Sequence, residues 1–377
     1  MSSPANPNSG EDSRRIQRPG RDPHLFRPLT LRGVTARNRI MLSPLCEYSS
    51  EDGMPNDWHL VHLGARAAGG AGIVCTEATH VSAEGRITQH CLGLWNEAQR
   101  DGLARIAAFI EGQGAVPAMQ LAHAGRKASI RRPWEGSTPQ SVADGGWQVL
   151  GPSALPFAPG HHTPVAMGLD DIARVTAEFA HSARLAREAG YRIIELHAGH
   201  GYLLHQFLSP LSNTRNDGYG GDTAGRTRLL LQIIAAVRAE WPQDLPLFVR
   251  LSCTDWVAGG LDVDEAIAIT RLIAATGAVD LMDCTTGGLD GRQKITPGPG
   301  YQVPFSEAIR RQTGMATGAV GMINTPDLAE EILANGRADL VIMGRKLMAE
   351  PHWPLHAARA LGVTGDWPVQ YERASLS

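Results

Sequence analysis

Short apolar runs alternate with longer amphipathic stretches along most of this 377-residue chain. Each run is rich in branched residues and ends in Gly or a polar residue, which is typical of a buried strand. The pattern predicts strands at Ile40–Pro44, Gly72–Ala78, Val116–His123, Arg192–His197, Leu247–Cys253, Val279–Cys284, Met315–Val320 and Leu340–Gly344.

The stretches between these strands show helical periodicity. In the clearest, Asp171–Ala189, Ile172, Val175 and Phe179 share one face, an acidic pair opens the segment and Gly190 closes it. Similar patterns predict helices at Ala224–Trp241, Asp264–Ala275 and Pro326–Asn335. Strands that alternate with helices pair in parallel, because each crossover returns the chain over the sheet.

Eight strand–helix units in one chain predict an α/β fold, a closed (β/α)8 TIM barrel. The alternative is an open doubly wound sheet, which usually has fewer strands and a GxGxxG turn after the first one; here the first strand runs into SPLCEYSS. We see no internal repeat and no linker after Leu25. We therefore predict one barrel domain over residues 25–377 and a disordered surface extension at residues 1–24.

Composition narrows the class of function. A hydrophobic share of 43% supports a sizeable core, and the 35 Lys and Arg nearly balance the 38 Asp and Glu. The formal net charge of -3 lacks the basic surplus of a dedicated nucleic-acid binder. We expect small-molecule chemistry and no nucleic-acid partner.

The five cysteines form an odd, widely spaced set without a CxxC pair. This spacing argues against a disulfide framework, a zinc ribbon and an iron–sulfur cluster. The N-terminal residues contain no apolar core of the signal-peptide kind, and no run of 18 apolar residues occurs. We therefore expect a cytoplasmic protein without a membrane partner.

Chemistry in such a barrel lies at the carboxyl ends of the strands. The last two ends are Gly-rich, with Gly321 after one strand and Gly344 and Arg345 after the other. Free backbone N–H groups beside a guanidinium make an anion pocket, which favours a phosphate-bearing cofactor or substrate. The alternative is that these glycines only let helices pack close to strands.

The fourth strand ends in His197 and His200, followed by Tyr202. The histidines could be zinc ligands, core residues or paired hydrogen-bond donors to a substrate oxygen, and a zinc site lacks an obvious third ligand. The tyrosine could be a proton donor or a core residue. Few acids occur at the strand ends, which disfavours a carboxylate-pair glycosidase and a hard-metal site.

Arg250 lies inside the apolar strand LFVRLS, where a guanidinium needs a partner. An anionic ligand would supply one, and an internal salt bridge is the alternative. Cys46 has no assignable His or Asn partner, so thiol catalysis is disfavoured. The cysteines expected to pack within apolar strands are Cys75, Cys253 and Cys284.

Several motifs together resemble those of the old yellow enzyme family of FMN-dependent ene reductases, in particular its bacterial thermophilic-like subclass of the NADPH dehydrogenase type. They are SPLCEYSS, QLAHAGRK, ELHAGHGYLLHQFLSPLSNTRNDGYGG, LFVRLS, ATGAVGMI, GRADL to GRKL, and QYER. The resemblance extends in order from Leu25 to Arg373, and it implies a TIM barrel independently of the strand count.

The resemblance also implies a cofactor site and a substrate site. FMN would contact Ser43, Pro44, Leu45, Cys46, Ala78, Gln120, Arg250, Gly321, Gly344 and Arg345. A substrate would contact Tyr48, His197, His200, Tyr202 and, from a neighbouring subunit, Arg373. Lys127 would adjoin the site, and the C-terminal subunit contact implies a homodimer or homotetramer.

The implied reaction is reduction of the activated C=C bond of an α,β-unsaturated carbonyl, nitro or maleimide compound, with NADPH or NADH as hydride donor. His197 and His200 would bind the substrate oxygen while Tyr202 protonates the α carbon after hydride transfer from flavin N5. Two other hypotheses are a metal-dependent barrel hydrolase that uses these histidines and a non-turnover flavin redox sensor that uses Cys46. The N-terminal extension and the 128–164 loop are departures from the family core that bear on substrate size and subunit contact.

Overall fold

The computed structural model describes residues 23–376, so residues 1–22 of the predicted extension lie outside the described part of the chain. All eight predicted strands are present and form one closed parallel barrel, which confirms the predicted fold class. Around the ring they are β3 (Ile40–Leu42), β4 (Ile73–His80), β5 (Val116–Ala122), β8 (Ile193–Ala198), β9 (Leu247–Ser252), β10 (Leu281–Thr285), β11 (Ala316–Ala319) and β12 (Leu340–Met343). Strand β12 pairs with β3 and closes the barrel.

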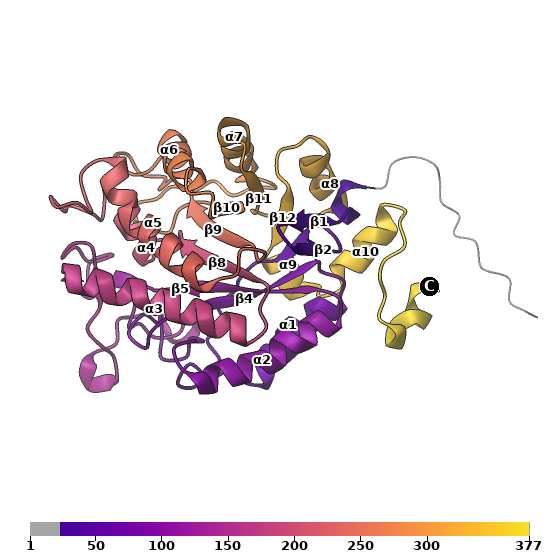
Figure 1. Cartoon of the computed structure of the whole chain (residues 1–377), viewed down its shortest axis with the longest axis horizontal. Helices are drawn as coiled ribbons and strands as arrows, with labels where there is room; N and C mark the ends of the chain where they lie inside the picture. Colours follow the sequence, from indigo (N-terminus) through magenta and orange to yellow (C-terminus); the bar gives the residue numbers. More distant parts are fainter. Residues whose placement is uncertain (1–22, 377) are drawn as a thin grey trace, which may run out of the picture.

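Helices connect successive strands and surround the barrel (Figure 1). They are α1 (Asp57–Ala68), α2 (Glu97–Gly112), α3 (Leu169–Glu188), α4 (Leu203–Leu208), α5 (Thr223–Glu240), α6 (Val263–Ala274), α7 (Val303–Thr313), α8 (Pro326–Ala334), α9 (Arg345–Ala349) and α10 (Trp353–Ala360). The four helices predicted from periodicity, α3, α5, α6 and α8, begin and end within two residues of their predicted bounds. No described helix is long and apolar enough to cross a membrane.

Local sequence explains where several helices begin. The side chains of Asn96, Asp222 and Asp262 each precede a helix and accept a hydrogen bond from a backbone N–H of its first turn. The apolar faces then pack on the barrel, where Phe179 of α3 and Trp241 after α5 are almost fully buried. Burial of one such side chain stabilises the fold by about 1.5–3 kcal/mol.

A hairpin covers the amino-terminal end of the barrel. Strands β1 (Leu29–Leu31) and β2 (Val34–Ala36) precede β3, and Gly33 between them donates its N–H to the Asp244 carbonyl, 2.8 Å away. Beside this contact the Arg32 guanidinium donates to Asp280 at 2.6 Å. Asp244 and Asp280 stand just before β9 and β10, so the hairpin leaves the carboxyl ends of the strands free for chemistry.

The long loop at 128–164 folds over the carboxyl ends of the strands. It contains the short strand β6 (Leu150–Gly151), which pairs with β7 (Val165–Ala166) just after the loop. Its Trp134 meets Tyr48 edge to face, with ring centroids 6.0 Å apart. The loop therefore contacts a residue that the sequence analysis assigns to the substrate site.

Candidate active site

Strand register brings four polar side chains together inside the barrel. His197 of β8 stands opposite Arg250 of β9, and Arg250 stands opposite Asp283 of β10. Register partners point to the same side of a sheet, as do residues two apart on one strand, so Glu195 shares this interior face. All four side chains are at most 5% exposed. The barrel interior is therefore polar where the predicted chemistry lies.

The two predicted histidines converge on one point. Nε2 of His197 lies 3.3 Å from Nδ1 of His200, and Nε2 of His200 lies 2.9 Å from the Thr285 hydroxyl. Burial lowers the pKa of both imidazoles well below the usual value, and neighbouring positive charge acts in the same direction. Both rings are therefore neutral, and an oxygen placed between the converging nitrogens could accept a hydrogen bond from each ring.

Tyr202 stands beside this pair, with its ring centroid 5.1 Å from that of His197. Burial raises the pKa of the Tyr202 phenol well above its usual value, so the phenol keeps its proton at neutral pH. Cys46 and Tyr48 pack against the same small apolar cluster as Tyr202. Burial raises the pKa of Cys46 too, which leaves a neutral thiol rather than a nucleophilic thiolate.

His200 begins a turn that is fixed by buried side chains. Its backbone has a positive φ of 55°, a left-handed conformation that is uncommon outside glycine. Its N–H donates to the Ser252 hydroxyl at 2.9 Å, and its carbonyl accepts from the Lys127 ammonium at 2.8 Å. These contacts hold the backbone of the turn in its strained conformation.

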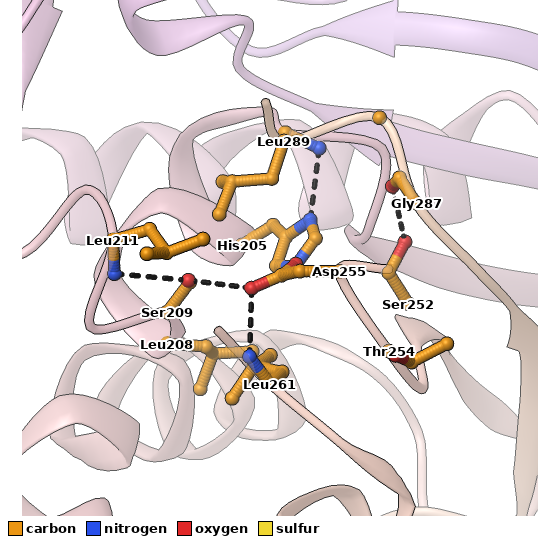
Figure 2. Close-up of polar contacts among 12 residues, drawn as sticks. His205, Leu208, Ser209, Leu211, Ser252, Thr254, Asp255, Leu261, Gly287 and Leu289 are labelled. Carbon is orange, nitrogen blue, oxygen red and sulfur yellow. Dashed lines mark hydrogen bonds and ion pairs between the residues drawn. The ribbon is translucent and has the colours of Figure 1, made fainter. Parts of the chain in front are cut away.

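Gly201, the next residue of the turn, is held through the buried pair of His205 and Asp255, which Figure 2 shows side by side. Its N–H donates to Nδ1 of His205 and its carbonyl accepts from Gln206, both at 2.8 Å. Nε2 of His205 lies 2.9 Å from Asp255, whose other carboxylate oxygen accepts from the Ser209 hydroxyl at 2.7 Å. Burial alone would raise the pKa of Asp255, but these contacts lower it below the usual value. Each peptide polar group of His200 and Gly201 thus has its own side-chain partner.

Lys127 joins two loops at the site. Its ammonium donates to the carbonyls of His200 and Gly288, at 2.8 and 2.9 Å. It also lies over the rings of Phe157 and Tyr202, 4.7 and 5.0 Å from their centroids. Burial lowers the pKa of this ammonium to about 8. The sequence placed Lys127 near the site, and its contacts show that it supports the turn that carries Tyr202.

A cavity of about 360 Å³ opens beside Arg250 at the carboxyl ends of the last strands. Six of the predicted cofactor residues line it: Ser43, Leu45, Arg250, Gly321, Gly344 and Arg345. Arg250 donates to the Ser43 hydroxyl at 2.9 Å. The sequence analysis missed other lining residues, because they are uncharged and lie outside the quoted motifs: Gln302 and Asn324.

The chemistry of this cavity fits FMN. Its described lining includes the cations Arg250, Arg345 and Lys346 and no carboxylate, which suits a phosphate group and an electron-rich ring. Apolar side chains such as Leu45 line the rest. Gly321 has a φ of +123°, and a Cβ there would come within 3.0 Å of a neighbouring side chain, so glycine keeps this wall open.

The other predicted cofactor residues lie along β3, β4 and β5. Pro44 stands between two cavity residues in the chain, directly after β3. Ala78 stands at an irregularity in the β4–β5 register, and its backbone lowers the pKa of the Cys46 thiol against the larger effect of burial. Gln120 of β5 is buried and donates to Glu195 at 2.8 Å. Pro44, Ala78 and Gln120 therefore form the part of the barrel wall that adjoins the residues lining the cavity.

Arg373 is the one predicted site residue that the chain does not bring to its own site. It is exposed in a C-terminal 3₁₀ helix (Val369–Leu376), which in Figure 1 extends beyond α10 and away from the barrel. Among residues 23–376, no three His, Cys, Asp or Glu side chains form a group that could hold a metal ion.

Comparison with known proteins agrees with this geometry. The model of a family described as "NADH:flavin oxidoreductase / NADH oxidase family" matches residues 24–362. The NADPH dehydrogenase of Geobacillus sp. (strain WCH70) is 46% identical over 351 residues, which cover 93% of this chain and 98% of that protein. That of Listeria innocua serovar 6a is also 46% identical, over 354 residues and the same shares of the two chains.

Solved structures show the same relationship. Morphinone reductase in complex with tetrahydroNAD has a TM-score of 0.75 and 25% identity, covering 93% of this chain and 94% of that one. An old yellow enzyme homologue from Zymomonas mobilis has a TM-score of 0.75 and 26% identity, covering 92% and 96%.

A closed barrel with a cationic cavity of this kind, together with these relatives, is that of a flavin-dependent oxidoreductase. The chain belongs to the NADH:flavin oxidoreductase / NADH oxidase family, and its predicted resemblance to the old yellow enzymes is confirmed. It is an FMN-dependent oxidoreductase with NAD(P)H as hydride donor. Family membership therefore decides against the metal-dependent hydrolase.

Gly201→Ala tests whether the turn is rigid. A Cβ at this position would lie 2.2 Å from the Gly288 carbonyl, on a backbone with φ +74°. We expect the alanine to lower the free energy of unfolding by ~1–2 kcal/mol through left-handed strain and by a further ~1–3 kcal/mol through overpacking. Thermal unfolding measures the loss of stability. Titration with p-hydroxybenzaldehyde, followed by flavin absorbance, should show at least about tenfold weaker binding.

Gly221→Ala is the matched control. Gly221 has the same φ of +74°, but no atom lies within 4 Å of the position of its Cβ. The Gly221→Ala variant should lose only the stability that left-handed strain costs, and it should bind p-hydroxybenzaldehyde as tightly as the wild type does. Equal effects of the two substitutions would contradict a turn fixed by close packing.

Proposed function

We propose that this oxidoreductase reduces the activated C=C bond of α,β-unsaturated carbonyl, nitro or maleimide compounds. One observation carries the proposal: the converging nitrogens of His197 and His200, 3.3 Å apart, beside the phenol of Tyr202. Addition of a hydride and a proton to a polarised alkene requires donors for the substrate oxygen and an acid for the carbon. This group of side chains offers both.

His197 and His200 act on the substrate oxygen. Negative charge develops on this oxygen as the conjugated β carbon accepts a hydride, so hydrogen bonds to it strengthen toward the transition state. The Thr285 hydroxyl lies 2.9 Å from Nε2 of His200, and the tautomer in which this hydroxyl donates to Nε2 would leave the Nδ1 proton for the substrate. Loss of one such donor typically lowers kcat by about 10²–10³.

Tyr202 delivers the proton to the α carbon. Because burial raises its pKa, the phenol holds its proton until that carbon becomes strongly basic. The Lys127 ammonium, 5.0 Å from the ring centroid, then stabilises the phenolate that remains. The fixed turn holds Tyr202 on the face of the alkene opposite the one that receives the hydride, while the histidines bind the substrate oxygen.

FMN, when bound, supplies the hydride and is itself reduced by NADPH or NADH. Arg250 holds a positive charge at the cavity wall and is oriented by its hydrogen bond to Ser43. Gly321, Gly344 and Arg345 would hold the phosphate of the cofactor. Their role is to place the cofactor, while the histidines and the tyrosine place the substrate.

Tyr48 and the 128–164 loop limit the size of the substrate. Tyr48 has a positive φ of 48°, which turns its ring toward Trp134 of the loop. Trp134 is 64% exposed and forms the outer rim of the site. We therefore propose compact substrates, with 2-cyclohexenone as the probe.

We further propose a homodimer or homotetramer in which Arg373 of one subunit reaches the substrate opening of another. Its support is the exposed position of Arg373 and of the apolar Val369 and Tyr371, which are 79% and 47% exposed. Sedimentation velocity that shows only monomer would contradict this assembly.

We place the enzyme in the cytoplasm, because all five cysteines are free.

Anaerobic turnover tests the proposed reaction. The FMN-loaded protein should oxidise NADPH only when 2-cyclohexenone is present, and gas chromatography should show one cyclohexanone for each NADPH consumed. NADPH oxidation that requires oxygen and yields no saturated ketone would contradict the proposal. A flavin that NADPH reduces once without turnover would support the redox-sensor hypothesis instead.

Tyr202→Phe separates the two halves of this reaction. Without the phenol, we expect reoxidation of the reduced enzyme by 2-cyclohexenone to slow by at least about 10²-fold, the usual contribution of a general acid. Stopped-flow absorbance should show unchanged reduction by NADPH.

Tyr219→Phe is the control for Tyr202→Phe, because the Tyr219 hydroxyl donates to Gln232 on the outer surface, at 3.0 Å. Both half-reactions should keep their wild-type rates in this variant. Normal reoxidation of Tyr202→Phe would show that another group supplies the proton.

A further inference from the structure

Glu195 and Asp283 form a buried carboxyl pair inside the barrel. Glu195 lies on β8 and Asp283 on β10, with Arg250 of β9 between them, and both carboxyl residues are 0% exposed. Nε of Arg250 lies 3.3 Å from Asp283, and Gln120 donates to one oxygen of Glu195 at 2.8 Å. The two carboxyl groups lie close enough for each to act on the pKa of the other. The reaction described above gives neither of them a role.

This pair has more acceptors than donors. Among the residues that the structure describes, the second oxygen of Glu195 and both oxygens of Asp283 have no hydrogen-bond donor. Buried oxygens are nearly always paired, and two ionised carboxylates in contact repel each other in a low-dielectric interior. A proton on one carboxyl group removes the repulsion and supplies the missing donor.

We propose that Glu195 and Asp283 share one proton, and that this proton sets the net charge that the Arg250 cluster presents to the flavin. With the proton, the guanidinium and one carboxylate sum to zero; without it, the cluster carries one negative charge. Arg250 lines the cavity that fits FMN, so the negative state opposes the addition of electrons to the flavin. The inference rests on the proposed placement of FMN in this cavity and is independent of the alkene substrate.

The surroundings place this titration near neutral pH. The pKa of Glu195 is raised to about 8; burial contributes most, the charge of Asp283 acts in the same direction, and Arg250 and Gln120 act in the opposite direction. Burial also raises the pKa of Asp283. Two other titratable groups with shifted pKa values face the cluster and are neutral at this pH, because burial raises the pKa of the Cys75 thiol on β4 and lowers that of the His197 imidazole on β8.

The sign of the effect follows from proton linkage. Below about pH 8 the pair holds its proton in both redox states of the flavin. Above about pH 8 the oxidised enzyme loses the proton, and the charge of the reduced flavin favours its return. The reduction potential should therefore fall more steeply with pH above about 8 than below it. The raised pKa also stabilises the fold at low pH, and this contribution is lost as the pH rises through about 8.

Glu195→Gln and Asp283→Asn test the shared proton. Each substitution leaves one carboxylate beside Arg250, so the net charge of the cluster stays at zero over the whole pH range of the titration. Spectroelectrochemical titration from about pH 6 to pH 10 should show wild-type potentials below about pH 8 and no change of slope above it. The double variant leaves Arg250 unbalanced and should have a higher potential throughout.

Two results would overturn the inference. If both carboxyls are ionised in the wild type, each single variant removes a negative charge and raises the potential at every pH. If the wild type shows no change of slope, no proton is shared near this pH.

Glu178→Gln is the control, because Glu178 is a partly buried carboxyl whose pKa is also raised, but it lies on α3 outside the barrel. It should keep the wild-type profile.

Infrared spectroscopy gives a readout that needs neither turnover nor a stable variant. The wild-type protein should show the C=O band of a buried protonated carboxyl group below about pH 8 and lose it above. Absence of this band at low pH, where other carboxylates are still ionised, would contradict the shared proton. If enone turnover fails but the band and the potential profile appear, the proposed substrate is wrong and this inference stands.

Discussion

The buried guanidinium of Arg250 is the interaction on which the rest of the site depends. A charge inside a barrel is costly unless it has close partners. Arg250 has two such partners from different parts of the barrel: the Ser43 hydroxyl after β3 and the Asp283 carboxylate on β10. The barrel must close for these partners to meet. The fold thereby places one positive charge at the wall of the cofactor cavity.

The other reactive groups stay neutral around this charge. Burial and neighbouring positive charge keep His197 and His200 unprotonated, while burial keeps Tyr202 and Cys46 protonated. A neutral set of donors has little charge to reorganise when negative charge develops on a substrate. The turn at Gly201 adds rigidity, because its peptide groups are already bonded to buried side chains. The site is therefore organised before the substrate arrives.

The sequence predicted those features that local pattern determines. Apolar runs bounded by polar residues marked all eight strands, and the residues at their carboxyl ends included Arg250 and the two histidines. It did not reveal pairs formed by residues far apart in the chain. His205 meets Asp255 only because the segments after β8 and β9 pack together, and Glu195 meets Asp283 only through strand register. The role proposed for Arg373 depends on a second subunit, which one sequence does not place.

The central claim of the proposed mechanism is that the fixed turn holds Tyr202 on the face of the alkene opposite the one that receives the hydride, while the two histidines bind the substrate oxygen. The most direct test is the reduction of 2-methylcyclohexenone in D2O, with the position and face of the deuterium read by nuclear magnetic resonance. The account predicts deuterium at the α carbon, on the face opposite the hydrogen that NADPH supplies through the flavin to the β carbon. Deuterium on both faces, or on the same face as that hydrogen, would contradict it.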